Sequence, residues 1–212
     1  MRVLLIRHAR STWNAERRWQ GWADPPLSPE GVAQAEAAAV AIHGLPIRAV
    51  VTSDLVRARS TAEIMARAAG VRVSVEPALR ERDVGLWSGL TSDEIEARWP
   101  GQLEAYRANP ETPLPDGECA EALMRRAMPA LLMIAREGPS GMVAIAVSHG
   151  GLIRCVRLAL IGVDRSIRGL AGCWLEADGS KLRLAADVDL LADARTSAPA
   201  AERECPSLPP SE

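Results

Sequence analysis

The sequence lacks several patterns that mark particular protein classes. It has no Phe, one Tyr and one Lys, Lys181, among 212 residues. Its formal net charge of -2 provides no positive field to favour nucleic acid or an anionic membrane surface. No apolar run approaches the ~20 residues of a membrane span, and residues 1–11 lack the pattern of a signal peptide. We expect a cytoplasmic globular protein whose partners are neither nucleic acid nor membrane.

Cysteine spacing gives no sign of a metal centre. The four cysteines form no CxxC pair and show no metal-ligand spacing: Cys119, Cys155, Cys173 and Cys205. We therefore expect no bound metal, no other cofactor and reduced thiols.

Short apolar runs alternate with helix-forming segments along most of the chain. Strands are expected at residues 3–6, 48–52, 71–75 and 142–147, with two more at 171–176 and 181–185. Helices are expected at residues 28–43, 54–69, 91–99, 118–137 and 152–161. This alternation predicts an α/β domain built on a mostly parallel sheet.

The domain is expected to cover residues 1–191. Residues 192–212 are rich in Pro, Ser and Glu, a composition that predicts a disordered C-terminal tail.

Polar side chains follow three of the predicted strands at the point where each strand ends. Arg7 and His8 follow the first strand, Arg57 lies in the first turn after the second, and His149 follows the strand MVAIAV. In a parallel sheet these positions share the carboxyl edge, where ligands of α/β proteins bind and helix N-termini favour anions. Each residue alone fits a solvated loop or surface position. Two of only three histidines at equivalent strand ends, with two arginines, indicate a phosphate site.

Two rival catalytic patterns fit their surroundings poorly. Cys119 and Arg125 satisfy the bare C-x5-R spacing of cysteine phosphatases, but the residues between them are helix-forming, lack Gly and include Glu121. Asp187 and Asp189 resemble the paired aspartates of haloacid-dehalogenase-type phosphatases, yet they lie near the C-terminus without the expected surroundings. There is also no GxxxxGK[ST] phosphate loop.

An ordered set of motifs resembles the histidine phosphatase superfamily, also called phosphoglycerate mutase-like. The motifs are RHARSTWN (7–14), QGWADPPLS (20–28), SDLVRA (53–58), TA (61–62), LRE (79–81), GLWSG (85–89), PDGE (115–118) and SHGG (148–151). The resemblance covers residues 1–185 and implies a three-layer domain with helices on both faces of the sheet. Two positions depart from the family pattern: Ala9 stands where Gly is usual, and Cys119 where Ser is frequent.

The resemblance implies a metal-independent mechanism with a phosphohistidine on His8, which attacks phosphorus as a neutral imidazole. The positively charged or donating groups that would hold the phosphoryl oxygens are Arg7, Arg57 and His149.

The resemblance also assigns Glu81 as the general acid that protonates the leaving group, with Asp83 as a second candidate. The remaining substrate-binding residues that it implies are Asn14, Gln20 and Gly150.

Within this family the sequence favours a phosphomonoester hydrolase acting on a small phosphorylated metabolite. Residues 89–115 are short beside the corresponding segment of phosphoglycerate mutases, and only Tyr106 and Arg107 resemble its closing Tyr and Arg residues. A cofactor-dependent phosphoglycerate mutase and a catalytically dead phosphate-binding protein stay open as alternatives. The substrate and the oligomeric state also stay open, with a homodimer as one option. The arginines considered for a second anionic group are Arg10, Arg18, Arg80 and Arg82.

Overall fold

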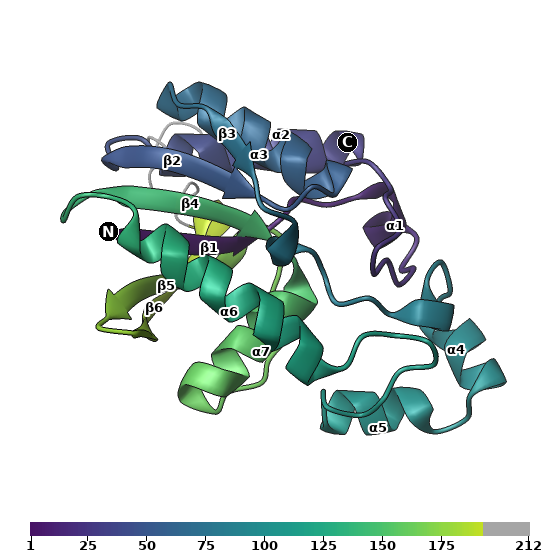
Figure 1. The fold of residues 1–212 in the computed structure, drawn as a ribbon. Coiled ribbons are helices and arrows are strands. Elements are labelled where there is room, and N and C mark those ends of the chain that lie inside the picture. Colours follow the sequence, from purple (N-terminus) through teal and green to yellow (C-terminus); the bar gives the residue numbers. More distant parts are fainter. Residues whose placement is uncertain (193–212) are drawn as a thin grey trace, which may run out of the picture.

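A six-stranded sheet forms the centre of the molecule (Figure 1). The computed structural model describes residues 1–192, and its strand order is β3-β2-β4-β1-β5-β6. The strands are β1 (Arg2–Arg7), β2 (Ile47–Thr52), β3 (Val73–Val75), β4 (Val143–Ser148), β5 (Ala171–Asp178) and β6 (Lys181–Asp189). Strands β1 to β4 pair in parallel, whereas β5 is antiparallel to β1 and β6 is antiparallel to β5. The predicted α/β class with a mostly parallel sheet is confirmed.

Helices cover both faces of this sheet, with α2 and α3 on one face and α6 and α7 on the other (Figure 1). The helices are α1 (Thr12–Ala15), α2 (Pro29–Ala41), α3 (Val56–Ala69), α4 (Ser92–Arg98), α5 (Gln102–Ala108), α6 (Ala120–Arg136) and α7 (Gly150–Ile161). Two 3-10 helices join them, η1 (Pro77–Leu79) and η2 (Gly85–Trp87). Over residues 1–192, no helix has both the length and the apolar character needed to cross a membrane. The predicted tail lies outside the described residues, except for Ala192.

The central strand β1 contributes side chains to both halves of the core. Val3 and Leu5 pack in the cluster on the α6–α7 side, whereas Leu4 and Ile6 pack in the cluster on the α2–α3 side. Successive side chains of a strand point to opposite faces of the sheet, so an unbroken apolar run indicates a strand buried on both faces. All four side chains are completely buried.

Local sequence signals place the helix ends close to where they were expected. Ser28 caps α2 by accepting a hydrogen bond from the Gly31 backbone N–H, and a proline occupies the first helical position. Helix α3 ends at Gly70, whose φ of 67° lies in the left-handed region that favours glycine. Cys119 caps α6 through its Sγ atom, which accepts from the Ala122 backbone N–H. The C-x5-R pattern therefore lies on a helix, as the composition indicated.

Residues 92–108 fold into α4 and α5, which lie beyond the carboxyl ends of β2 and β4 (Figure 1). Only α4 was expected from its capping box. A separate small core holds these helices against the rest of the domain, with Trp87 completely buried and in edge-on contact with Trp19 and Tyr106. Tyr106 therefore lies near the edge of the sheet at which Arg7, His8 and Arg57 follow their strands.

Candidate active site

The order of the strands brings the predicted histidines and Arg57 together. Strand β4 lies between β1 and β2, so the residues that follow the three strands converge at one edge. The rings of His8 and His149 have centroids 5.1 Å apart. The Arg57 Nε–H donates to His8 Nε2 at 3.3 Å. The side chains of His8, Arg57 and His149, which the sequence predicted to lie close together, therefore form a cluster.

His8 is held by hydrogen bonds at both ring nitrogens, Nδ1 to a carbonyl oxygen and Nε2 to the Arg57 guanidinium. Its Nδ1 lies 2.6 Å from the Ala9 carbonyl oxygen. A carbonyl only accepts, so Nδ1 carries the proton and Nε2 keeps a lone pair when the ring is neutral. Burial lowers the pKa of His8 well below its usual 6.5, and the positive charges of Arg57 and Arg7 lower it further. The ring is therefore neutral at physiological pH.

Ala9 stands where the motif resemblance leads one to expect glycine, and its backbone accommodates alanine. It is absent from the described non-glycine residues with positive φ, so the backbone there does not require glycine. Its N–H donates to the Thr61 hydroxyl at 3.1 Å, and the side chain is buried.

The two predicted arginines, Arg57 completely buried and Arg7 half-buried, keep their positive charge. Arg57 is completely buried and donates to the carbonyl oxygens of Ala23 and Gly21 at 2.7 and 2.8 Å. Burial lowers the pKa of Arg57 to about 10, opposed by the negative charge of Glu81. Arg7 donates to the Ile167 carbonyl oxygen at 2.7 Å, and burial lowers its pKa as well. Two guanidinium groups therefore face a single carboxylate.

Glu81 approaches the beginning of helix α7 with both carboxylate oxygens. Oε1 accepts from the backbone N–H groups of Arg82 and Leu152 at 2.8 and 3.1 Å, and Oε2 accepts from that of Gly151 at 3.1 Å. A Cβ at residue 151 would lie 2.5 Å from Oε1, so glycine makes this close approach possible. The carboxylate thus lies where the helix dipole stabilises negative charge.

His149 lies beside His8 but is completely buried. Its Nε2 is 2.6 Å from the Ser53 hydroxyl, and its Nδ1 is buried without a hydrogen-bond partner in the described part of the chain. Burial lowers the pKa of His149 well below 6.5, with Arg57 the next largest cause. His149 is thus a neutral ring with one free polar atom.

A cavity of about 320 Å³ opens beside these side chains. The predicted residues that line it are Arg7, His8, Asn14, Gln20, Arg57, Glu81 and Gly150. His149 is the one predicted site residue, among those described, that is not part of this lining. Its place behind His8 is a feature that sequence position alone did not reveal.

Several lining residues were not expected from the sequence. The added ones with polar side chains are Arg17, Arg154 and Ser166. Arg154 lies on α7 four residues after Gly150. This spacing places the two residues on the same face of a helix, so the sequence could have indicated Arg154. Arg17 has a left-handed φ of 58° that no local pattern indicated.

The arginines considered for a second anion divide into two groups. Arg18 and Arg82 line the cavity, whereas Arg10 and Arg80 form ion pairs with Glu30 and Asp54 and are not part of its lining in residues 1–192.

The second candidate acid, Asp83, is not in the cavity lining of the described chain. Its Oδ1 instead accepts from the Gly85 backbone N–H at 3.0 Å. Of the two carboxylates, only Glu81 lies beside His8 and the two arginines.

Comparison with known proteins identifies the family. The family model for the histidine phosphatase superfamily (branch 1) matches residues 3–172. The chain belongs to this superfamily. It is 37% identical over 166 residues to a probable phosphoglycerate mutase GpmB of Klebsiella pneumoniae, which covers 77% of this chain and 76% of that protein.

Solved structures of the family have the same fold. A mycobacterial glucosyl-3-phosphoglycerate phosphatase in complex with VO3 aligns with a TM-score of 0.80 and 30% identity, over 88% of this chain and 97% of that one. Bacillus stearothermophilus YhfR aligns with a TM-score of 0.81 and 28% identity, over 90% and 98% of the two chains. The family contains phosphatases and mutases. This chain is therefore an enzyme, and family membership does not distinguish hydrolysis from phosphoryl transfer to a second substrate position.

The buried histidines predict a loss of stability in mild acid. In the unfolded chain His8 and His149 become protonated near pH 6.5. In the folded protein their pKa values are lowered, so they become protonated only at lower pH. Their stabilising contribution is thus complete above pH 6.5 and falls below it, by up to about 1.4 kcal/mol per pH unit for each histidine. Urea unfolding at pH 7.0 and 5.5 measures the difference.

The matched comparison uses the double replacement His8→Asn with His149→Asn and the single replacement His43→Asn at an exposed helix end. The double variant should lose most of the pH dependence, and the His43 variant should keep it. An unchanged slope in the double variant would assign the acid sensitivity to other groups.

Proposed function

We propose that this enzyme is a phosphomonoester hydrolase that forms a phosphohistidine on His8. The observation that carries the proposal is the environment of His8. Its Nδ1–H donates to the Ala9 carbonyl oxygen, and its Nε2 lone pair accepts from the Arg57 Nε–H at the cavity, a hydrogen bond that the attack on phosphorus would replace. A neutral imidazole with one fixed tautomer is the form that attacks phosphorus.

The positive groups around His8 suit a phosphate monoester, which is a dianion near neutral pH. Arg57 is completely buried and Arg7 half-buried at the cavity wall, where their charges are less screened than in water. Phosphoryl transfer places charge on three equatorial oxygens, and fixed guanidinium groups stabilise that charge. We propose that Asn14, Gln20 and the Gly150 backbone, which also line the cavity, help to hold the substrate.

His149 would supply a further donor without becoming charged. If the Ser53 hydroxyl donates to Nε2, the neutral ring carries its proton on Nδ1, the atom that has no partner in the described residues. Because Nδ1 is buried behind the cavity wall, a phosphoryl oxygen on His8 would accept from it once substrate binding turns the ring toward the cavity. This assignment agrees with the lowered pKa of His149.

Glu81 is proposed as the general acid and base. His8 Nε2 forms a bond to phosphorus as the ester P–O bond breaks, and protonated Glu81 gives its proton to the leaving oxygen, which departs as an alcohol. Water then attacks the phosphohistidine, ionised Glu81 takes the proton of that water, and inorganic phosphate leaves with His8 again neutral. The position of the Glu81 carboxylate beside the cavity supports both steps.

Hydrolase and mutase share the phosphohistidine and differ in its acceptor. The solved neighbours at about 30% identity include a phosphatase, which supports hydrolysis. The name of the curated Klebsiella relative and the presence of Tyr106 in the cavity lining favour the mutase alternative. Hydrolysis is favoured because residues 89–115 are short beside the segment that closes over the substrate in phosphoglycerate mutases.

The assay with 3-phosphoglycerate separates these two reactions. Enzyme is incubated with it in EDTA, with and without 2,3-bisphosphoglycerate, while 2-phosphoglycerate and inorganic phosphate are followed. We expect phosphate release to exceed isomerisation and to be independent of the bisphosphate. A control with p-nitrophenyl phosphate establishes that the preparation is active. Rapid isomerisation with little phosphate release would overturn the hydrolase assignment.

A further inference from the structure

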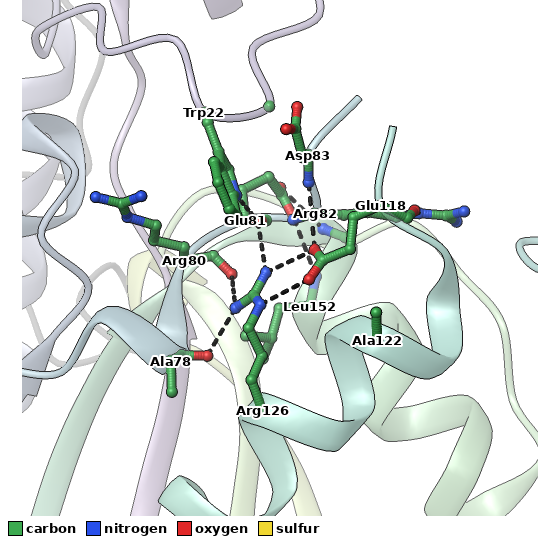
Figure 2. A network of polar contacts seen from close by, with 12 residues as sticks. Trp22, Ala78, Arg80, Glu81, Arg82, Asp83, Glu118, Ala122, Arg126 and Leu152 are labelled. Atoms are coloured by element: carbon green, nitrogen blue, oxygen red, sulfur yellow. Dashed lines mark hydrogen bonds and ion pairs between the residues drawn. The ribbon is translucent and has the colours of Figure 1, made fainter. Parts of the chain in front are cut away.

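The segment that carries Glu81 is ordered by side chains. From η1 onward this segment has no strand partner within residues 1–192, yet four consecutive backbone carbonyl oxygens, those of residues 78–81, accept hydrogen bonds from side chains. Ser148 Oγ donates to the Leu79 oxygen at 2.8 Å, and Trp22 Nε1 donates to the Glu81 oxygen at 2.7 Å. The other donor is Arg126, which bonds to three of the four oxygens (Figure 2).

Arg126 uses all five of its N–H groups in this network. Its two terminal nitrogens donate to the carbonyl oxygens of Ala78, Arg80 and Glu81 at 2.7, 2.9 and 2.8 Å. The remaining N–H groups, on Nε and one terminal nitrogen, donate to the two carboxylate oxygens of Glu118, both at 2.8 Å. A guanidinium has five donors in a rigid plane, so every one is engaged in a fixed direction.

Glu118 extends the network to the backbone of Asp83, two residues after Glu81. Its backbone N–H donates to the Asp83 carbonyl oxygen at 2.9 Å, and its Oε2 accepts from the Asp83 N–H at 3.4 Å. The ion pair with Arg126 is largely buried, with side chains 13% and 21% exposed. The pair therefore joins α6 to the backbone on both sides of Glu81 (Figure 2).

We propose that Arg126, paired with Glu118, is a positioning residue that fixes the backbone of Glu81 so that its carboxyl group lies at the leaving-group side of His8. The proposal rests on the role of Glu81 given under Proposed function. Within residues 1–192, neither member of the pair lines the cavity, so both act through Glu81. A displacement of about 1 Å costs ~10²-fold in well-oriented reactions, which makes the location of this backbone matter.

The replacement Arg126→Lys tests the proposal because it keeps the charge opposite Glu118. Lysine has three donors, so at least two of the five bonds are lost. We expect kcat/KM for phenyl phosphate, whose leaving group needs a proton, to fall ~10-fold or more. With p-nitrophenyl phosphate the loss should stay below ~3-fold, since its leaving group needs little protonation. Phosphoenzyme formation is measured by rapid quench for both esters.

The matched control is Arg125→Lys on the preceding residue of α6. Its side chain is 72% exposed and pairs with the exposed Glu121. This variant should hydrolyse both esters at the original rates, because its ion pair does not touch residues 78–81.

A double-variant comparison separates positioning from general damage. In the Glu81→Gln background the acid is already absent, so adding Arg126→Lys should cause no further loss with phenyl phosphate. If the two losses multiply, Arg126 acts independently of Glu81 and the proposal is overturned. If Glu81→Gln alone slows both esters equally, the acid role of Glu81 fails instead.

A second variant guards against misfolding of Arg126→Lys. The paired replacement Arg126→Met with Glu118→Met removes both charges, so no carboxylate is left buried and unpaired. Circular dichroism and thermal melting establish that it is folded. The folded variant should show the same selective loss with phenyl phosphate. Equal rate changes for both esters would reduce the pair to a structural role.

Discussion

Replacing His8 with alanine should abolish turnover, with a loss of at least ~10³-fold in kcat for any accepted monoester. The variant removes the nucleophile, and neither the arginines nor His149 can take its place. With labelled substrate and an acid-free quench, the unmodified enzyme should yield acid-labile, base-stable phosphate on His8, and the variant none. Retention of more than ~1% of the activity would contradict a phosphohistidine on this residue.

Two controls accompany the His8 variant. His43→Ala changes a histidine that is exposed at the end of α2 and should leave turnover unchanged. Circular dichroism and thermal melting of His8→Ala test whether the fold survives the loss of a buried ring. A folded and inactive variant assigns the effect to chemistry.

Glu81→Gln should slow phosphoenzyme formation in proportion to the need of the leaving group for a proton. We expect a loss of ~10²–10⁴-fold with phenyl or alkyl phosphates and a much smaller loss with p-nitrophenyl phosphate. Glutamine has nearly the same shape but cannot donate a proton as an acid does. Rapid-quench rates over a series of aryl phosphates give the dependence on leaving-group pKa, which should be steeper in the variant.

Asp83→Asn is the matched control for Glu81→Gln. Asp83 is the neighbouring carboxylate and bonds to the Gly85 backbone rather than lining the cavity. This variant should leave the leaving-group dependence unchanged. A selective loss with poor leaving groups in Asp83→Asn, and none in Glu81→Gln, would move the acid role to Asp83.

Much of the fold could be predicted because it depends on local patterns. The apolar run of β1 and the serine and proline at the start of α2 indicate their elements without knowledge of any partner. Helix α5 was missed because it lacks a side-chain cap and is preceded by Gly101, whose φ of 76° is left-handed. Its position depends on the small core around Trp87, which forms only when distant segments meet.

The sequence by itself determined the family and the class of fold, and it named the residues proposed for the site. His8, Arg57 and His149 follow predicted strands, and parallel pairing is enough to bring such positions to one edge. It did not determine how the ring nitrogens are bonded. That His8 carries its proton on Nδ1 depends on a hydrogen bond to the Ala9 carbonyl, and that His149 lies behind the cavity wall depends on packing.

Only the tertiary structure decided how the backbone around Glu81 is held. Arg126 and Glu81 are 45 residues apart, and nothing in the amphipathic pattern of α6 indicates that one of its arginines binds three carbonyl oxygens of another segment. Carbonyl oxygens are present on every residue, so the sequence carries no mark of which ones a guanidinium selects. That selection follows from the distance and angle between α6 and the segment after η1, which are set by the packing of the whole domain.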